Sequence, residues 1–326
     1  MSELVGLLYV DESLVTVLKS LLPGHHVHVT TAAELGALAA RASKTTIAFV
    51  DASLLLQIDG GALGVPVIAV ITDAPGAILQ RTISLLDSFP WLSHVISGAM
   101  LSSALAPVHV RGLLERGARY GQGRVLSDEC KGRVALIGSA SRRDARFDRM
   151  NEFFTASGVG KRAIEALNEV AEELVLNALY DAPVEAGFFP GAVPRTEDVT
   201  LPPDRACEIS YGVASNKAFV RVRDPFGALT RSRLLSVLRR CSGGNVSIDE
   251  SRGGAGLGMW RVLSSATSLE IVVIPGQVTD ITLTVAIRGA RNLLSLDVYF
   301  EDSRGLDGLA DSVQPDLVDE SVTLVR

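Results

Sequence analysis

The stretch AEELVLNALY, residues 171–180, decides how the second half of this chain is interpreted. It belongs to a longer run, 162–180, in which apolar residues recur at helical spacing and no Pro or Gly intervenes. Glu173 and Asn177 are four residues apart, so a helix places them on one face, one turn apart. An amide oxygen can ligate Mg²⁺, and a carboxylate beside it can orient or deprotonate a water or hydroxyl group. Alone, this weak pattern also fits an ordinary solvated helix face.

Two later segments favour the first interpretation. Residues 222–229, VRDPFGAL, end a strand-like run in Asp224 and a tight turn. Residues 253–260, GGAGLGMW, form a glycine-rich turn that opens a helix. Such a turn offers free backbone N–H groups and a helix N-terminus, and both attract phosphate oxygens. The alternative is a flexible linker. Leu257 stands between glycines and a helix is expected after it, and both features favour the phosphate-binding turn over the linker.

These motifs, in this order and spacing, resemble the Bergerat ATP-binding fold of gyrase, the MutL mismatch-repair proteins, histidine kinases and anti-sigma-factor serine kinases. The resemblance covers residues 133–288 and implies an α/β sandwich that binds ATP with Mg²⁺. It implies that Asn177 holds Mg²⁺ and that Asp224 accepts the adenine amino group. The other site residues that it implies are Gly227 for close approach to the base, Gly254, Gly256, Leu257 and Gly258 around the phosphates, Glu173 as general base or water orienter, and Thr279 as the family's late threonine.

One position departs from the family pattern. The family's D-x-G-x-G is here DPFGA, residues 224–228, so Phe226 replaces the first glycine. This substitution bears on the geometry of the adenine pocket and therefore on the affinity for nucleotide.

The first 121 residues alternate short apolar runs with helical segments. Runs at 4–10, 45–50 and 65–71 are strand-like, and each is followed by polar residues. This alternation predicts a doubly wound parallel sheet covered by helices on both faces. In such sheets function gathers at the carboxyl ends of the strands. The polar residues at these ends are Asp11, Glu12, Asp51 and Thr72.

This set resembles a response-regulator receiver domain, which has a flavodoxin-like fold. The resemblance implies that Asp11, Glu12 and Asp51 bind Mg²⁺. It also implies that Asp51 is the phosphoacceptor and that Thr72 supplies the hydroxyl group. The family places Lys-Pro at the fifth strand, and this chain has Ser97 there. Without the ammonium group an acyl phosphate loses a charge partner, so we favour a pseudo-receiver that docks to a partner over the alternative, a working phospho-switch. For Glu12, a solvated loop residue is a further alternative.

Length and composition allow two domains, since 326 residues with 47% hydrophobic content can fill two cores. We expect a receiver-like domain at 1–121, a linker at 122–132, a histidine-kinase-like ATP-binding domain at 133–288 and an acidic extension at 289–326. The longest apolar runs are strand-sized, so we expect no membrane span. The N-terminus lacks the basic start of a secretory signal.

Charge and cysteine usage indicate compartment and partners. The three cysteines are scattered without metal-binding spacing, which is typical of a reducing cytoplasm. The net charge of -6 argues against general nucleic-acid binding. Four arginines fall within residues 142–149, but Asp144 and Asp148 are interleaved with them, which favours a solvated helix face over a surface for an acidic partner.

Two functions follow from these patterns. A histidine kinase is not expected, because His109 lacks the acidic neighbour of that family and no histidine follows it. Gyrase-like and MutL-like ATPases carry a transducer domain, for which little chain remains after residue 288. We therefore expect a signalling regulator that binds ATP and Mg²⁺ and acts on a protein partner. It would be either a protein-serine kinase of the anti-sigma type or an ATPase. A homodimer is one expected form of the protein. The alternative is a non-catalytic scaffold that uses both domains as interaction surfaces.

Overall fold

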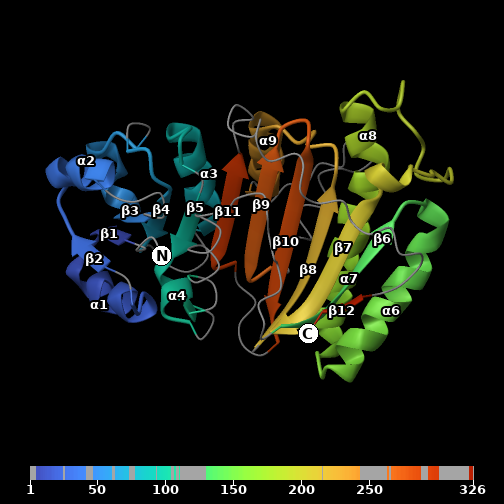
Figure 1. Ribbon diagram of the computed structural model, residues 1–326, viewed down its shortest axis with the longest axis horizontal. Helices are drawn as coiled ribbons and strands as arrows, with labels where there is room; N and C mark the ends of the chain where they lie inside the picture. The colour runs from blue at the N-terminus through green and yellow to red at the C-terminus, as the bar shows by residue number, and fades with distance from the viewer. Residues whose placement is uncertain are drawn as a thin grey trace. The chain divides into compact units, whose positions relative to one another are not determined.

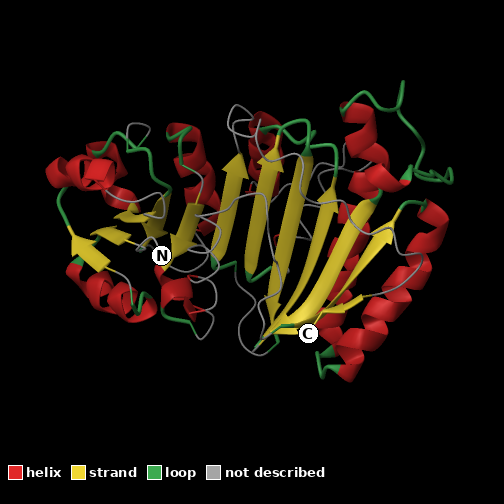
Figure 2. Ribbon diagram, in the orientation of Figure 1, coloured by secondary structure: helices red, strands yellow, loops and turns green. Residues whose placement is uncertain are grey.

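The structure is a computed structural model of a mixed α/β protein, with strands paired both in parallel and antiparallel (Figures 1 and 2). The chain divides into two compact units, residues 1–123 with 292–298, and residues 124–291 with 299–326. The residues that the structure describes are 5–24, 26–41, 47–60, 63–72, 78–92, 94–103, 106–107, 110, 130–214, 216–242, 263, 266–287, 293–300 and 323–325.

The first unit contains five parallel strands in the order β2–β1–β3–β4–β5. Their bounds are β1 Val5–Tyr9, β2 His26–Val29, β3 Ile47–Asp51, β4 Val67–Ile71 and β5 His94–Ser97. Every residue of β3, β4 and β5 is buried, as expected for strands that are covered on both faces. The helices are α1 Glu12–Leu21, α2 Ala32–Arg41, α3 Ile78–Ser88 and the short α4 Gly98–Leu101. Figure 1 shows α2 and α3 on one side of these strands and α1 and α4 on the other.

A sixth strand, β11 Ser295–Phe300, pairs antiparallel with β5. It comes from the stretch that the sequence indicated only as an acidic extension. Leu296 and Val298 are fully buried, and the polar residues beside them, Ser295 and Asp297, are buried as well, so this strand is covered on both faces. Another short strand of that stretch, β12 Thr323–Val325, pairs with β6 of the second unit. The stretch therefore contributes to the sheets of both units.

The second unit has an antiparallel sheet in the order β12–β6–β7–β8–β10–β9. The bounds are β6 Lys131–Ile137, β7 Cys207–Ala214, β8 Lys217–Asp224, β9 Ser268–Ile274 and β10 Val278–Ala286. Strands β7 and β8 follow each other in the chain and pair antiparallel as a hairpin. The helices are α6 Arg143–Ala156, α7 Lys161–Leu176, α8 Ala182–Glu185 and α9 Arg231–Ser242, with short turns at Ala140–Arg142 and Pro203–Arg205.

Helix α7 packs on β8 and β10, and α6 packs on α7 and β7. The buried stripe of α7 includes Leu167, Val170 and Leu174, which recur three and four residues apart. This packing fixes the end of α7 over the strand that carries Asp224. Among the helices that the structure describes, none is long and apolar enough to cross a membrane.

Candidate functional site

The central helix changes geometry at the residues that the sequence singled out. Residues 162–180 were predicted as one helix, whereas α7 ends at Leu176 and continues as a single π-helical turn, Asn177–Asp181. The turn is closed by the N–H group of Ala182, which donates to the carbonyl oxygen of Asn177. Such turns are rare and often occur at functional sites. Here the turn places Asn177 and Asp181 beside the same hollow.

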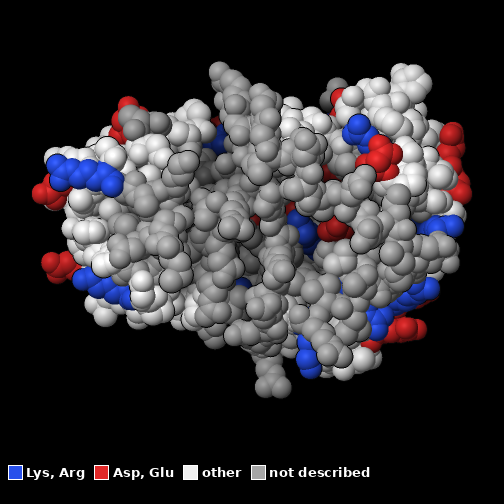
Figure 3. Space-filling model, viewed as in Figure 1, with Lys and Arg blue, Asp and Glu red and all other residues white. Residues whose placement is uncertain are grey.

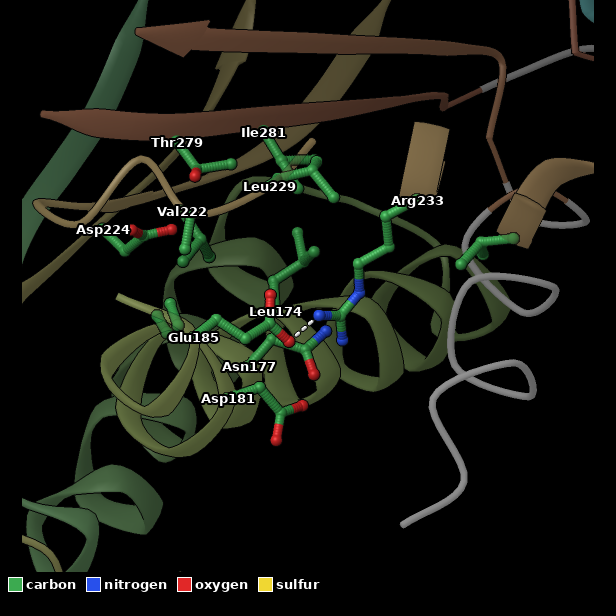
Figure 4. A pocket seen from close by; sticks show the side chains of 14 residues that line it. Leu174, Asn177, Asp181, Glu185, Val222, Asp224, Leu229, Arg233, Thr279 and Ile281 are labelled. Carbon is green, nitrogen blue, oxygen red and sulfur yellow. Dashed lines mark ion pairs between the residues drawn. The ribbon is translucent and has the colours of Figure 1, made fainter. Parts of the chain in front are cut away.

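This hollow has a cavity volume of about 100 Å³ (Figure 4). Its apolar lining comes from α7, β8, β10 and α9 and from the residues that link them: Leu174, Ala178, Ala182, Val222, Ala228, Leu229, Val237 and Ile281. Its polar lining residues are Asn177, Asp181, Glu185, Asp224, Arg233 and Thr279. An apolar hollow with a few convergent polar groups is typical of a small-molecule site.

Asp224 is the buried acid of this hollow. It is the last residue of β8, it is 8% exposed, and its Oδ1 accepts from the N–H groups of Phe226 at 2.9 Å and Gly227 at 3.3 Å. Thr279 pairs with it in register on β10 and also donates a hydrogen bond to it. Burial raises the pKa of Asp224 to about 6, although the bonds from Phe226, Gly227 and Thr279 oppose that rise. At neutral pH it is an ionised acceptor with lone pairs to spare.

The turn after Asp224 depends on Gly227. Its φ is +58°, and a Cβ atom there would lie 2.2 Å from the carbonyl oxygen of Ile274. The turn is therefore pressed against the backbone between β9 and β10, and only glycine fits. The close approach that requires glycine is to this backbone, and Gly227 does not line the hollow.

Phe226, where the family has glycine, points away from the hollow. Its side chain is 3% exposed and packs against Phe188, with ring centres 5.7 Å apart. The Arg205 guanidinium lies over the Phe226 ring, 5.7 Å from the ring centre. It also donates to the carbonyl oxygen of Pro225 at 3.0 Å. The phenyl ring is thus held in a separate aromatic cluster, and it does not fill the space beside Asp224.

Arg195 joins the acidic and amide groups of the central helix. Its Nη2 donates to Oδ1 of Asn177 at 2.9 Å and to Oδ2 of Asp181 at 3.0 Å. Its Nη1 lies 3.5 Å from Oε2 of Glu173. Burial alone would lower the pKa of Arg195, but the charges of Glu173 and Asp181 and their hydrogen bonds outweigh it, so the pKa is raised. The Arg195 guanidinium is therefore hydrogen-bonded to the Asn177 amide oxygen, which was predicted to bind Mg²⁺.

The loop that carries Arg195 is anchored at several points. Glu197 donates its N–H to the carbonyl oxygen of Pro194 at 3.0 Å, which closes a turn around Arg195. The Tyr180 hydroxyl donates to the carbonyl oxygen of Glu197 at 2.5 Å. The N–H of Ser141 donates to Asp198 at 2.9 Å. Because these bonds attach the loop to the π-helical turn after α7 and to the residues after β6, the guanidinium is positioned by the fold.

Glu173 and Asn177 lie on one face, as the helical spacing predicted, but they differ in access. Asn177 lines the hollow and Glu173 does not. Oε1 of Glu173 is buried and has no hydrogen-bond partner within the described part of the chain. A second cationic contact, the ion pair of Arg233 with Glu185, lies at the edge of the hollow (Figure 4). Neither Arg195 nor Arg233 belongs to a sequence motif, so neither was predicted.

The predicted nucleotide residues are thus only partly assembled by the described residues. Asn177, Asp224 and Thr279 meet in one hollow. The predicted phosphate-binding residues, Gly254, Gly256, Leu257 and Gly258, lie outside the residues that the structure describes.

In the first unit, the predicted receiver carboxylates serve as helix caps. Asp11 accepts from the N–H of Ser13 at 3.0 Å at the start of α1. Asp51 is 6% exposed and accepts from both the N–H and the hydroxyl of Ser53, at 2.9 and 2.7 Å. Glu12 and Thr72 are exposed at the ends of β1 and β4. Within the described residues no group of three or more His, Cys, Asp or Glu is arranged to hold a metal ion.

Ser97, for which the sequence resemblance predicted a departure from lysine, has a structural role. Its hydroxyl donates to the carbonyl oxygen of Leu294 at 2.7 Å and accepts from the N–H of Met100 at 3.1 Å. It therefore caps α4 and attaches β5 to the chain that leads into β11.

In comparisons with known proteins, no protein-family model and no curated protein matches this chain.

Proposed function

We propose that the second unit binds ATP, with the adenine base against Asp224. The observation that carries the proposal is the buried Asp224 carboxylate, which faces an apolar hollow together with Thr279. A flat heterocycle fits apolar walls such as Val222 and Ile281, and an exocyclic amino group would give the carboxylate a donor. The motif order, which resembles the Bergerat family, supports the same ligand.

The donor groups also fit Mg²⁺. Asn177 and Asp181 line the hollow, and the Glu173 carboxylate has a buried oxygen without a described partner. These are hard oxygen ligands of the type Mg²⁺ prefers, with phosphate oxygens and water completing the set. Bound Mg²⁺ would neutralise phosphate charge there. For Asn177 to act as a ligand, the Arg195 guanidinium must leave its amide oxygen.

The proposed activity is phosphoryl transfer to a serine of a partner protein, as in the anti-sigma kinases that the sequence resembles, or hydrolysis of ATP. Such catalysis consists mostly of positioning and charge stabilisation. Glu173 would accept the proton of the attacking hydroxyl group. It lies one turn from Asn177 and carries its charge against Arg195, so release of Arg195 would free both groups at once.

A second candidate function, a non-catalytic scaffold, is favoured by the same arginine. Arg195 already satisfies the residues that catalysis needs, and the loop that carries it is anchored on both sides. In this alternative the ATP pocket and the first unit are protein-interaction surfaces.

For the first unit we propose a flavodoxin-like pseudo-receiver that docks a protein partner in the cytoplasm. The strand order β2–β1–β3–β4–β5 supports this architecture, since it is the order of the flavodoxin-like folds. The capping roles of Asp51 and Ser97 argue against a working phospho-switch, because both side chains are already engaged in fold contacts.

Calorimetry of ATP binding with and without MgCl₂ tests the proposal. Wild-type protein should bind ATP, and bind it more tightly with Mg²⁺. Asn177→Ala should retain binding but lose the dependence on Mg²⁺. Absence of binding at millimolar Mg·ATP would leave the scaffold as the better account.

A further inference from the structure

A second polar site lies on the α6 side of the sheet, and it shares no lining residue with the Asp224 hollow. Arg133 on β6 pairs in register with Tyr211 on β7, and its side chain forms a hydrogen bond with the Tyr211 hydroxyl. The Arg133 guanidinium lies 5.7 Å from the centre of the Phe153 ring. Phe153, on α6, contacts Tyr211 edge-on at 5.5 Å between ring centres. These contacts attach the charged end of Arg133 to the seam between α6 and the sheet.

Helix geometry brings two more arginines to this seam. At about 100° per residue, Arg146 and Arg149 project from the flank of α6 that also carries Phe153. Asp144 and Asp148 project about 160° away from Arg146. Asp144 instead pairs with Arg143, at 3.3 Å. The sequence indicated a helix face with balanced charge. In the helix, Asp144 and Asp148 lie on another face from Arg146, while Glu152 lies about 60° from Arg149 on the arginine flank. Figure 3 shows Lys and Arg side chains over the region of α6, with Asp and Glu side chains beside them.

Two of the guanidinium groups at this seam have N–H groups without an acceptor among the described residues. Nε of Arg133 and Nη1 of Arg146 are buried and form no hydrogen bond. In the described part of the chain, no Asp or Glu forms an ion pair with Arg133, Arg146 or Arg149. Buried donors without partners are costly, and a bound anion or water is the usual explanation.

The positive potential of the cluster reaches the buried tyrosine. Burial raises the pKa of Tyr211, while the charges of Arg133, Arg146 and Arg149 lower it. An open hollow of about 630 Å³ adjoins Arg133, and its lining residues are Lys131, Arg133, Glu152, Phe153, Ala156, Ser157 and Val213. It therefore offers one carboxylate, one ammonium group and an aromatic wall beside the Arg133 guanidinium.

We propose that Arg133, Arg146 and Arg149 bind a phosphate-type oxyanion, with the adjoining hollow accepting the group that carries it. Guanidinium groups suit such a ligand, because they present several fixed N–H donors to tetrahedral oxyanions. Lys131 adds a further positive charge at the rim. The anion is either free phosphate or the phosphate ester of a protein segment. This site is independent of the proposed ATP pocket.

The test uses the full chain and two probes, inorganic phosphate by calorimetry and a fluorescent phosphoserine peptide by anisotropy. Both should bind wild-type protein, and Arg133→Gln and Arg146→Gln should each weaken binding at least about tenfold, which corresponds to one charge-assisted bond. Arg149→Gln removes an exposed group and should weaken binding without affecting folding. Arg143→Gln, on the same helix but paired with Asp144, is the matched control and should leave binding unchanged.

The two probes distinguish the source of the phosphate. Tighter binding of the phosphopeptide supports a phosphorylated protein segment, and equal binding supports free phosphate. Three results would overturn the proposal: no binding of either probe, binding that Arg149→Gln leaves intact, or equal binding of the unphosphorylated peptide. The Asp224→Asn variant should keep phosphate binding, and its loss would place the anion in the other hollow.

Discussion

Replacement of Arg195 by glutamine should tighten the Mg²⁺-dependent part of ATP binding. Nη2 of Arg195 lies 2.9 Å from Oδ1 of Asn177. A Mg²⁺ ion on that oxygen, at about 2.1 Å, would then be at most about 5 Å from the guanidinium nitrogen. Glutamine removes the positive charge and retains a polar side chain in the loop.

The size of the effect follows from these distances. Even with the dielectric constant of water, the repulsion between Mg²⁺ and one positive charge at 5 Å is about 1.7 kcal/mol. Loss of the arginine also frees the carboxylates of Glu173 and Asp181 to attract the ion. Since 1.4 kcal/mol corresponds to a factor of ten, the affinity for Mg·ATP should rise at least about tenfold.

The assay is calorimetry of ATP binding at a series of MgCl₂ concentrations. Lys161→Gln is the matched control, because it makes the same change of charge at a side chain that is 91% exposed on α7. The midpoint of the Mg²⁺ dependence should move to lower concentration in Arg195→Gln and stay in place in Lys161→Gln. An unchanged midpoint, or weaker binding in Arg195→Gln, would refute competition and make Arg195 a contact to the phosphates.

Three further predictions concern the other acids. Glu173→Gln should retain ATP binding and lose turnover by roughly 10²–10⁴-fold, the usual contribution of a general base, while the exposed Glu172→Gln changes neither; equal turnover of Glu173→Gln and wild type excludes the catalytic role. The pKa of Asp224 is about 6 in the folded protein and 3.8 for the free side chain, so the folded state binds this proton more tightly. The free energy of unfolding should therefore fall by about 3 kcal/mol as the pH rises from 3.8 to about 6. Asp224→Asn should lack this fall in urea titrations at pH 4 and pH 7, and an identical pH dependence of the variant and the wild type would contradict the raised pKa. Asp51 should not be modified by acetyl phosphate, and a stoichiometric adduct there in mass spectrometry would restore the phospho-switch.

Several parts of the fold were accessible from sequence because they depend on local patterns. The apolar stripe of α7 predicted a helix, and the alternation in the first 121 residues predicted a parallel sheet; both are present. The meeting of Asp224 with Thr279 follows from the pairing of β8 with β10, which the motif order alone did not require.

Other parts were not accessible, because they depend on contacts distant in sequence. Arg195 is a lone arginine in a proline-rich loop, and only the anchoring of that loop brings it to Asn177. The strand β11 was hidden because acidic residues dominate its surroundings, and burial of Leu296 and Val298 becomes clear only beside β5. The outward direction of Phe226 depends on Phe188 and Arg205, which no motif includes.

The affinity of wild-type protein for Mg·ATP relative to Mg·GTP tests the central proposal most directly. Adenine carries an amino donor where guanine carries a carbonyl acceptor, and the Asp224 carboxylate can accept only from the former. We expect ATP to bind roughly 10²-fold more tightly than GTP, because a buried acceptor facing a carbonyl oxygen is left unpaired. In Asp224→Asn this preference should largely disappear. Equal affinity of the wild-type protein for the two nucleotides would contradict the assignment of Asp224 to the base.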